Sequence, residues 1–148
     1  MGLELVVTER HLECLQNTKP CERGYILAER VENELWTMRI MPGNPGFQLI
    51  APSELRNVIV QVLTECQGYL PFIRPTTGFD RQIAEKHYLE EAFELNELDR
   101  LYGFNKLFGY VLIGKEPFFY GFEEFGDDKT GKITTVRRMP IQTLRRSA

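Results

Sequence analysis

Apolar side chains recur at helical spacing in the middle of the chain. They stand three or four positions apart, at Leu55, Val58, Ile59, Val62, Leu63 and Cys66. Ser53 is suited to cap the first turn, and Gly68 is suited to end the helix. Because several of these residues are β-branched, we expect packing against a sheet to stabilise this helix.

A second helix is predicted to follow the proline-containing segment that ends at Pro75. Residues 77–80 have the spacing of a capping box, and the helix that they open is expected to run to about Leu95. A short continuation begins at Asn96 and stops at Gly103. The middle of the chain is therefore predicted to be mainly helical.

Strand-like patterns lie on both sides of this helical block. Residues 25–31 and 35–40 are separated by Glu32-Asn33, which predicts a β-hairpin, and the Pro and Gly residues of 42–46 predict a loop. Three later runs, 110–113, 118–125 and 133–138, are joined by tight turns, which predicts an antiparallel meander. Residues 3–16 are ambiguous and fit a strand followed by one or two helical turns from Thr8.

This order of elements predicts a single α+β domain over residues 1–148. In this fold the N-terminal hairpin and the C-terminal three-stranded meander form a mostly antiparallel sheet, and the two main helices pack on one face of it. A chain of 148 residues with 43% hydrophobic side chains is long enough to bury its own core. Residues after about 140 are expected to fray.

Charge and cysteine content restrict the class of protein. With 18 basic and 21 acidic residues the net charge is -3, which disfavours a dedicated nucleic-acid binder. The first residues lack the basic and apolar regions of a signal peptide, and no apolar run approaches the ~18 residues needed to cross a bilayer. The odd number of cysteines, 3, favours reduced thiols, so we expect a cytoplasmic protein that does not contact membranes.

Two familiar catalytic motifs are incomplete in this chain. Residues 126–132 match the spacing of a phosphate-binding loop, but Ile133 occupies the position where Ser or Thr should bind magnesium, and a strand pattern follows. Ser53 and Ser147 are the serines of the chain, and neither is placed for nucleophilic catalysis. We therefore expect no nucleotide cofactor and no serine hydrolase activity.

Metal-binding patterns are weak as well. His11, Cys14 and Cys21 do not have a recognised zinc spacing. On the second helix, His87, Glu91 and Glu94 share one face, but no second helix carries a matching motif. We predict no metal site and interpret both sets as ordinary side chains.

The charges are distributed unevenly. Residues 85–99 have a local net charge of -5, whereas residues 132–148 are basic without a single acid. These two stretches can meet within the fold, associate two copies into a homodimer, or remain solvated. If the acidic helix face is an interaction surface, the residues that bind the partner are Glu90, Glu91 and Glu94.

Aromatic residues are concentrated in the run from Pro117 to Phe125. Phe118, Tyr120 and Phe122 share one face of the predicted strand, with Tyr110 and Glu124 nearby. Core packing is one interpretation of this face, since aromatic rings bury a large area. A concave surface that binds a ligand or a partner is the other.

These observations favour a non-catalytic protein that binds either a protein partner or a small apolar ligand. In the first case the acidic helix would mask a basic partner, as an inhibitor or immunity protein does. The alternative is a small enzyme with a carboxylate and histidine site in a sheet-lined pocket. An enzyme would require a carboxylate or His87 to converge with hydrogen-bond donors on a cleft.

Overall fold

The computed structural model describes residues 3–50, 53–57, 60, 68–76, 80–101, 106–124 and 133–144. For residues 123–124, 133–135 and 144 the description covers the backbone. Within these ranges the elements follow in the order β1 (Glu4–Thr8), α1 (Glu9–Gln16), β2 (Arg23–Val31), β3 (Glu34–Pro42), β4 (Gly68–Ile73), α3 (Arg81–Leu101), β5 (Gly109–Ile113), β6 (Pro117–Glu124), β7 (Ile133–Pro140) and β8 (Gln142–Leu144). Residues 53–57 are also helical.

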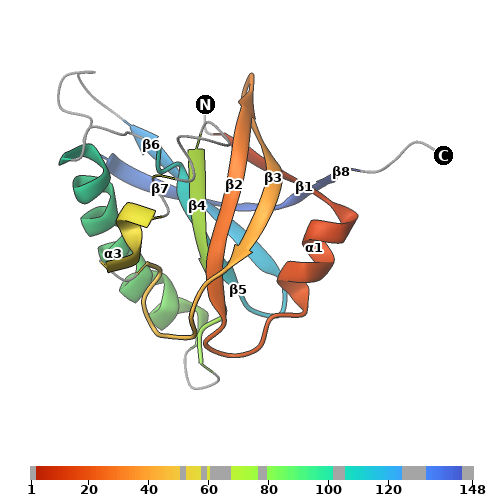
Figure 1. Cartoon of the computed structure of the whole chain (residues 1–148), viewed down its shortest axis with the longest axis horizontal. Coiled ribbons are helices and arrows are strands. Elements are labelled where there is room, and N and C mark those ends of the chain that lie inside the picture. Colours follow the sequence, from red (N-terminus) through yellow and green to blue (C-terminus); the bar gives the residue numbers. More distant parts are fainter. Residues whose placement is uncertain are drawn as a thin grey trace.

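The eight described strands form one mixed sheet in the order β7-β6-β5-β4-β2-β3-β1-β8 (Figure 1). The pairs β2–β3, β2–β4, β5–β6 and β6–β7 are antiparallel. The pairs β1–β3, β1–β8 and β4–β5 are parallel.

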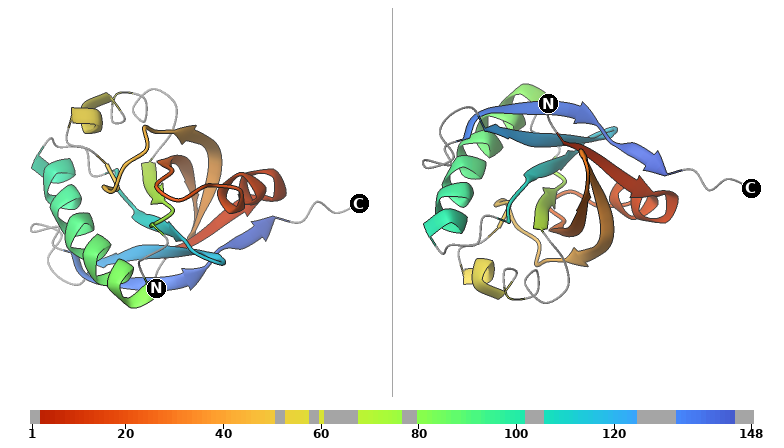
Figure 2. Two further views of the ribbon diagram at one scale, coloured as in Figure 1. Left: turned by 90° about the horizontal axis from the view of Figure 1, so that it is seen from below. Right: turned by 90° about the horizontal axis from the view of Figure 1, so that it is seen from above.

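The sheet curves until its two edges nearly meet. Strands β7 and β8 stand at opposite ends of the strand order, yet Ile141 is the one residue between them in the chain. This continuous segment therefore pairs with β6 along its first part and with β1 along its last part. The result is a nearly closed, barrel-like sheet, with α1 and α3 on opposite sides of it (Figure 2).

The predicted fold, a hairpin and an antiparallel meander with both helices on one face, is wrong. The β2–β3 hairpin and the β5–β6–β7 meander are both present as local pairings. However, β4 joins them into one sheet through an antiparallel bond ladder to β2 and a parallel one to β5. Parallel pairs connect distant parts of a chain, and periodicity within a short window does not reveal which distant strands will pair.

Strand β4 was missed because Pro71 lies in its middle. Proline cannot donate to a bond ladder and normally argues against a central strand. Here Pro71 lies between two successive residue pairs that β4 makes with its parallel neighbour, Tyr69–Leu107 and Phe72–Val111. Because the pairing with the parallel neighbour is interrupted at this point, the strand tolerates a proline, which has no N–H to donate.

The two faces of the sheet bury separate cores. The concave face packs against Leu15 of α1 and contains Leu5, Val7, Ile26, Ala28, Leu35, Leu70, Phe72, Val111, Ile113, Phe119 and Met139. The outer face packs against α3 and the helical residues 53–57, and it contributes Tyr25, Leu27, Tyr69, Ile73, Tyr110, Leu112 and Tyr120. The helices therefore cover different faces, which corrects the single layer expected from the sequence.

Thr8 and Asp80 each cap a helix. Thr8 ends β1 and caps α1, because its Oγ1 accepts a hydrogen bond of 3.1 Å from the N–H of His11. The Oδ1 of Asp80 accepts one of 2.8 Å from the N–H of Ile83. The predicted change from strand to helix at Thr8 is confirmed.

The predicted boundaries of α3 were inaccurate. This helix begins at Arg81 and continues without a break to Leu101, so the main helix predicted to Leu95 and the continuation predicted from Asn96 are one element. Most of the predicted first helix after residue 57 and the phosphate-loop pattern of 126–132 lie outside the described residues.

Within the part expected to fray after residue 140, Gln142–Leu144 pair with β1. Across the described ranges, none of the helices combines the length and apolar character that a membrane crossing needs.

Candidate functional site

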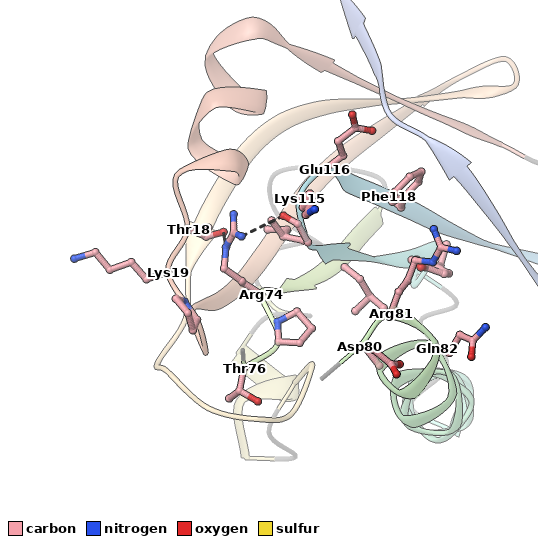
Figure 3. A pocket seen from close by; sticks show the side chains of 17 residues that line it. Thr18, Lys19, Arg74, Thr76, Asp80, Arg81, Gln82, Lys115, Glu116 and Phe118 are labelled. Atoms are coloured by element: carbon pink, nitrogen blue, oxygen red, sulfur yellow. Dashed lines mark hydrogen bonds between the residues drawn. The ribbon is translucent and has the colours of Figure 1, made fainter. Parts of the chain in front are cut away.

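An open basin of about 1230 Å³ lies between the first turn of α3 and the adjoining ends of β4, β5 and β6 (Figure 3). Residues of the segments 18–20 and 74–76 complete its wall. Its lining consists of Thr18, Lys19, Pro20, Arg74, Pro75, Thr76, Asp80, Arg81, Gln82, Ala84, Leu112, Ile113, Gly114, Lys115, Glu116, Phe118 and Tyr120.

The apolar floor of the basin is part of the outer-face core. Leu112 of β5 is opposite Phe118 of β6, and Tyr120 lies two residues further along the same strand face. The Tyr120 ring stacks on Tyr110 with a centroid separation of 4.9 Å and an interplanar angle of 4°. The Cζ of Arg138 stands 5.3 Å from the centroid of the Phe118 ring. These contacts fix the aromatic side chains in place.

Arg74 forms one side of the basin and is held by hydrogen bonds to two other segments. Its Nε donates to Thr18 Oγ1 at 3.0 Å, and its two terminal nitrogens donate to the carbonyl oxygens of Gln16 at 2.9 Å and Gly114 at 3.2 Å. The guanidinium therefore links the end of α1 to the β5–β6 turn. These bonds orient a permanent positive charge at the mouth of the basin.

The first turns of α3 form the opposite side. Glu85 Oε1 accepts hydrogen bonds of 2.9 Å from both the Tyr120 hydroxyl and Arg138. The Nε of Arg81 lies 3.6 Å from the same oxygen. Burial, followed by the hydrogen bond to Glu85, raises the pKa of Tyr120, so this hydroxyl stays a donor at neutral pH.

Cations outnumber acids around the basin. Its charged lining residues are Lys19, Arg74, Arg81, Lys115, Asp80 and Glu116, with a net charge of +2. Asp80 already uses one oxygen to cap α3. The protein as a whole has a net charge of -3, so the positive lining is a local property of the basin.

The structure places the aromatic residues singled out in the sequence at different depths. Phe118 and Tyr120 line the basin, whereas Tyr110 lies beneath them and is 1% exposed. Phe122 packs against the outer-face core. The side chain of Glu124 is outside the described part of the structure.

The acidic residues singled out in the sequence do not form one surface. Glu90 and Glu94 are exposed on α3, but Glu91 turns toward the segment 43–50 and accepts a hydrogen bond of 2.6 Å from the N–H of Leu49. The His87 ring makes an edge contact with Tyr88, at a centroid separation of 4.8 Å. Across the described ranges, no group of three or more His, Cys, Asp or Glu side chains is arranged to bind a metal ion.

The acidic and basic stretches are in contact within the fold. Glu85 of the acidic stretch pairs with Arg138 of the basic stretch, at 2.9 Å. Asp99, which counts toward the acidic charge, is fully buried and accepts a hydrogen bond from the Tyr69 hydroxyl at 3.0 Å. Part of the charge asymmetry therefore serves the fold.

A second polar cluster lies away from the basin, around Arg23. Two terminal nitrogens of Arg23 donate to the Glu54 carboxylate at 2.6 and 3.2 Å, and the Tyr25 hydroxyl donates to the same carboxylate. Burial alone would raise the pKa of Glu54, but the hydrogen bonds from Arg23 and Tyr25 together lower it. This cluster anchors the helical residues 53–57 to β2.

Sequence reasoning missed Arg74, Arg81 and Lys115 as residues of a common site. Arg74 follows β4, a strand that the sequence did not predict, Arg81 begins α3, and Lys115 lies in the turn between β5 and β6. One signal in the sequence could have indicated the site. Charged residues stand at the ends of apolar runs, and Arg74, for example, directly follows Ile73.

Comparison with models of known protein families finds no match for this chain, and comparison with curated protein sequences finds no similar relative.

Proposed function

We propose that this protein is a non-catalytic binding protein and that it takes a small, largely apolar ligand in the basin beside α3. The observation that carries the proposal is the basin itself, with a volume of about 1230 Å³ and a floor of Leu112, Phe118 and Tyr120. Sites for small organic ligands typically enclose about 300–1,000 Å³ and combine apolar walls with a few polar groups. The open basin exceeds this range, so it has room for such a ligand, and it has the composition of such a site.

The packing around the floor supports binding by a preformed surface. Tyr120 stacks on the buried Tyr110, and Arg138 covers Phe118 from one side. Rings that are already held in place lose little conformational freedom when a ligand settles on them. A ligand ring on Phe118 would therefore gain contact area at a small entropic cost.

The polar groups near the floor favour binding over catalysis. The Glu85 oxygen closest to Tyr120 already accepts from that hydroxyl and from Arg138. A general base must reach the proton that it removes, whereas this oxygen is occupied by donors. His87, the histidine of α3, is not among the residues that line the basin.

The proposal includes a cytoplasmic location, on the ground of thiol chemistry. Cys14 is exposed and Cys21 is half-buried, and both are free thiols. Exposed free thiols persist most readily in a reducing compartment. Labelling of Cys14 by a membrane-impermeant maleimide only after cell lysis would support this location, and labelling of intact cells would contradict it.

The binding proposal is tested with N-phenylnaphthylamine, an uncharged aromatic dye whose fluorescence rises in apolar surroundings. The dye is titrated into the wild-type protein and into the variants Phe118→Ala and Phe47→Ala. Phe47 is the matched control because its ring is 65% exposed and does not line the basin. We expect Phe118→Ala to weaken dye binding by about fivefold to tenfold, since it removes roughly 1–1.4 kcal/mol of ring contact.

The control variant should bind the dye as the wild type does. Equal affinities for Phe118→Ala and the wild type, with both proteins folded by circular dichroism, would contradict binding in the basin. A dye that fails to bind the wild-type protein at all would contradict the proposed function itself.

A further inference from the structure

We infer that the ligand of the basin is an organic anion whose acidic group binds Arg81 while its apolar part lies on Phe118. This inference rests on the proposed function and adds the charge of the ligand and the residue that recognises it. Arg81 and Phe118 both line the basin, the first from the start of α3 and the second from β6 (Figure 3).

The local charge selects for an anion. The charged residues that line the basin sum to +2 on a protein of net charge -3, so the lining is more positive than the protein as a whole. One of its two acids, Asp80, uses an oxygen to cap α3. An anion that enters the basin meets cations at its rim and an apolar floor below, a combination that suits an amphipathic molecule.

Glu85 positions Arg81 without cancelling its charge. The carboxylate lies 3.6 Å from the Nε of Arg81, but it is much closer to Arg138, at 2.9 Å. Two guanidinium groups therefore share one carboxylate, and this cluster keeps a net positive charge. The Arg81 side chain is 61% exposed, so its terminal nitrogens remain accessible to an incoming acidic group.

The place of Arg81 in the helix adds to this preference. It is the first residue of α3, where backbone N–H groups point out of the helix and the helix dipole is positive. A planar guanidinium at this position can form two parallel hydrogen bonds to a carboxylate or sulfonate. Arg81 is therefore the specificity-determining residue for the acidic group.

Arg74 contributes to the field from the opposite side. Its Nε and both terminal nitrogens already donate to Thr18, Gln16 and Gly114. Removing Arg74 would break these bonds between three segments, so its substitution cannot separate binding from folding. Among the residues that the structure describes, Arg81 makes one ionic contact, the one of 3.6 Å with Glu85, so its substitution is the cleaner test.

The experiment compares two dyes that share one ring system. N-phenylnaphthylamine is neutral, and anilinonaphthalene sulfonate adds an anionic group to the same rings. We expect the wild-type protein to bind the sulfonate about fivefold more tightly than the neutral dye, the effect of one exposed ion pair of roughly 1 kcal/mol. Raising the salt concentration should weaken binding of the sulfonate and leave the neutral dye unaffected.

Variants of Arg81 assign the preference to that residue. Arg81→Gln should reduce the affinity for the sulfonate to that for the neutral dye, and Arg81→Lys should retain part of the preference. Arg100→Gln is the matched control, because Arg100 lies in the last turn of α3, roughly 28 Å from Arg81 along the helix. It removes the same charge and should keep the wild-type preference.

The two dyes separate failure of this inference from failure of the proposed function. If the neutral dye binds and depends on Phe118, but the sulfonate has no advantage or keeps it in Arg81→Gln, the anion inference is wrong and the binding function stands. If the neutral dye does not bind, both are wrong. Thermal melts of each variant confirm that a change in affinity does not come from unfolding.

Discussion

The Glu91 carboxylate of α3 accepts a hydrogen bond of 2.6 Å from the backbone N–H of Leu49, and this bond fastens the segment 43–50 to the helix. The Tyr88 hydroxyl supports the same segment by donating to the carbonyl oxygen of Phe47 at 3.0 Å. Burial raises the pKa of Glu91 from 4.5 to about 7, although hydrogen bonds from Leu49 and Ile50 oppose the shift. A group that titrates near neutral pH thus holds this segment.

The first prediction is that Glu91 makes the protein less stable as the pH rises toward 7. Between pH 4.5 and about 7 its carboxyl is protonated in the folded state and ionised in the unfolded state. The folded state therefore binds more protons, and the free energy of unfolding falls as the pH rises through this interval. Urea unfolding at about pH 5 and about pH 8 should show this decrease, and Glu91→Gln should reduce it.

Glu90→Gln is the control for this measurement, since Glu90 is exposed on the same helix. It should keep the wild-type dependence on pH. The prediction fails if Glu91→Gln and the wild type lose the same stability over the interval.

The second prediction divides the acidic residues of α3 by their structural role. Reversing Glu90 and Glu94 to Lys should change stability by less than about 1 kcal/mol, since both side chains are exposed. Adding Glu91→Lys should lower the free energy of unfolding by about 2 kcal/mol or more. The Leu49 N–H loses its acceptor, and the new cation is repelled by Arg23. Denaturant midpoints of the double and triple variants measure the difference.

The double variant also tests the hypothesis of a protein partner. If a basic partner or a second copy binds the acidic face, reversal of Glu90 and Glu94 should slow association and weaken its dependence on salt. If the association rate and the oligomeric state are both unchanged, the partner hypothesis is wrong and these side chains are an ordinary solvated surface.

The third prediction concerns Asp99, which is fully buried in the last turns of α3. Its two oxygens accept hydrogen bonds from the Tyr69 hydroxyl at 3.0 Å and from the Lys106 N–H at 2.8 Å. Asp99→Asn replaces one carboxylate oxygen with an amide N–H₂ group, which would face a hydrogen-bond donor. We therefore expect the free energy of unfolding to fall by about 1–3 kcal/mol. Glu97→Gln, an exposed neighbour, should be close to neutral in the same denaturant titration.

The fourth prediction is that the protein binds neither ATP nor GTP. The phosphate-loop pattern leads into β7, which begins at Ile133 and pairs Ile133 with Glu124 of β6. A phosphate loop requires a helix at this position and a hydroxyl side chain for magnesium. Equilibrium dialysis with magnesium should show no saturable binding, and a micromolar affinity that disappears in Lys132→Ala would refute the prediction.

Local patterns were informative where a few neighbouring residues determine the structure. The alternation around Glu32-Asn33 predicted the hairpin of β2 and β3, and the structure pairs Val31 with Glu34 across that turn. Residues 3–16 were ambiguous, but one interpretation of them, a strand followed by helical turns from Thr8, matches the structure, where the Thr8 hydroxyl binds an N–H only three residues away. Such contacts depend on short stretches of sequence, which periodicity describes well.

The site could not be derived in this way. Arg74 and Arg81 are only a few residues apart, but they become opposite walls of one basin because β4 pairs with β5 and α3 then crosses the outer face. Those placements depend on long-range pairing and on a strand that contains Pro71. The aromatic face around Phe118 was recognised, but the sequence did not show where it meets solvent.

The uninterrupted run from β7 through Ile141 to β8 has a consequence for how the chain is made. Val6 leaves the ribosome long before its parallel partner Gln142 does. Until then the free edge of β1 offers unpaired backbone groups to any other strand, including one from a neighbouring nascent chain. A ribosome that stalls before Gln142 would leave this edge open, so the edge of β1 is protected only after synthesis has passed through β8.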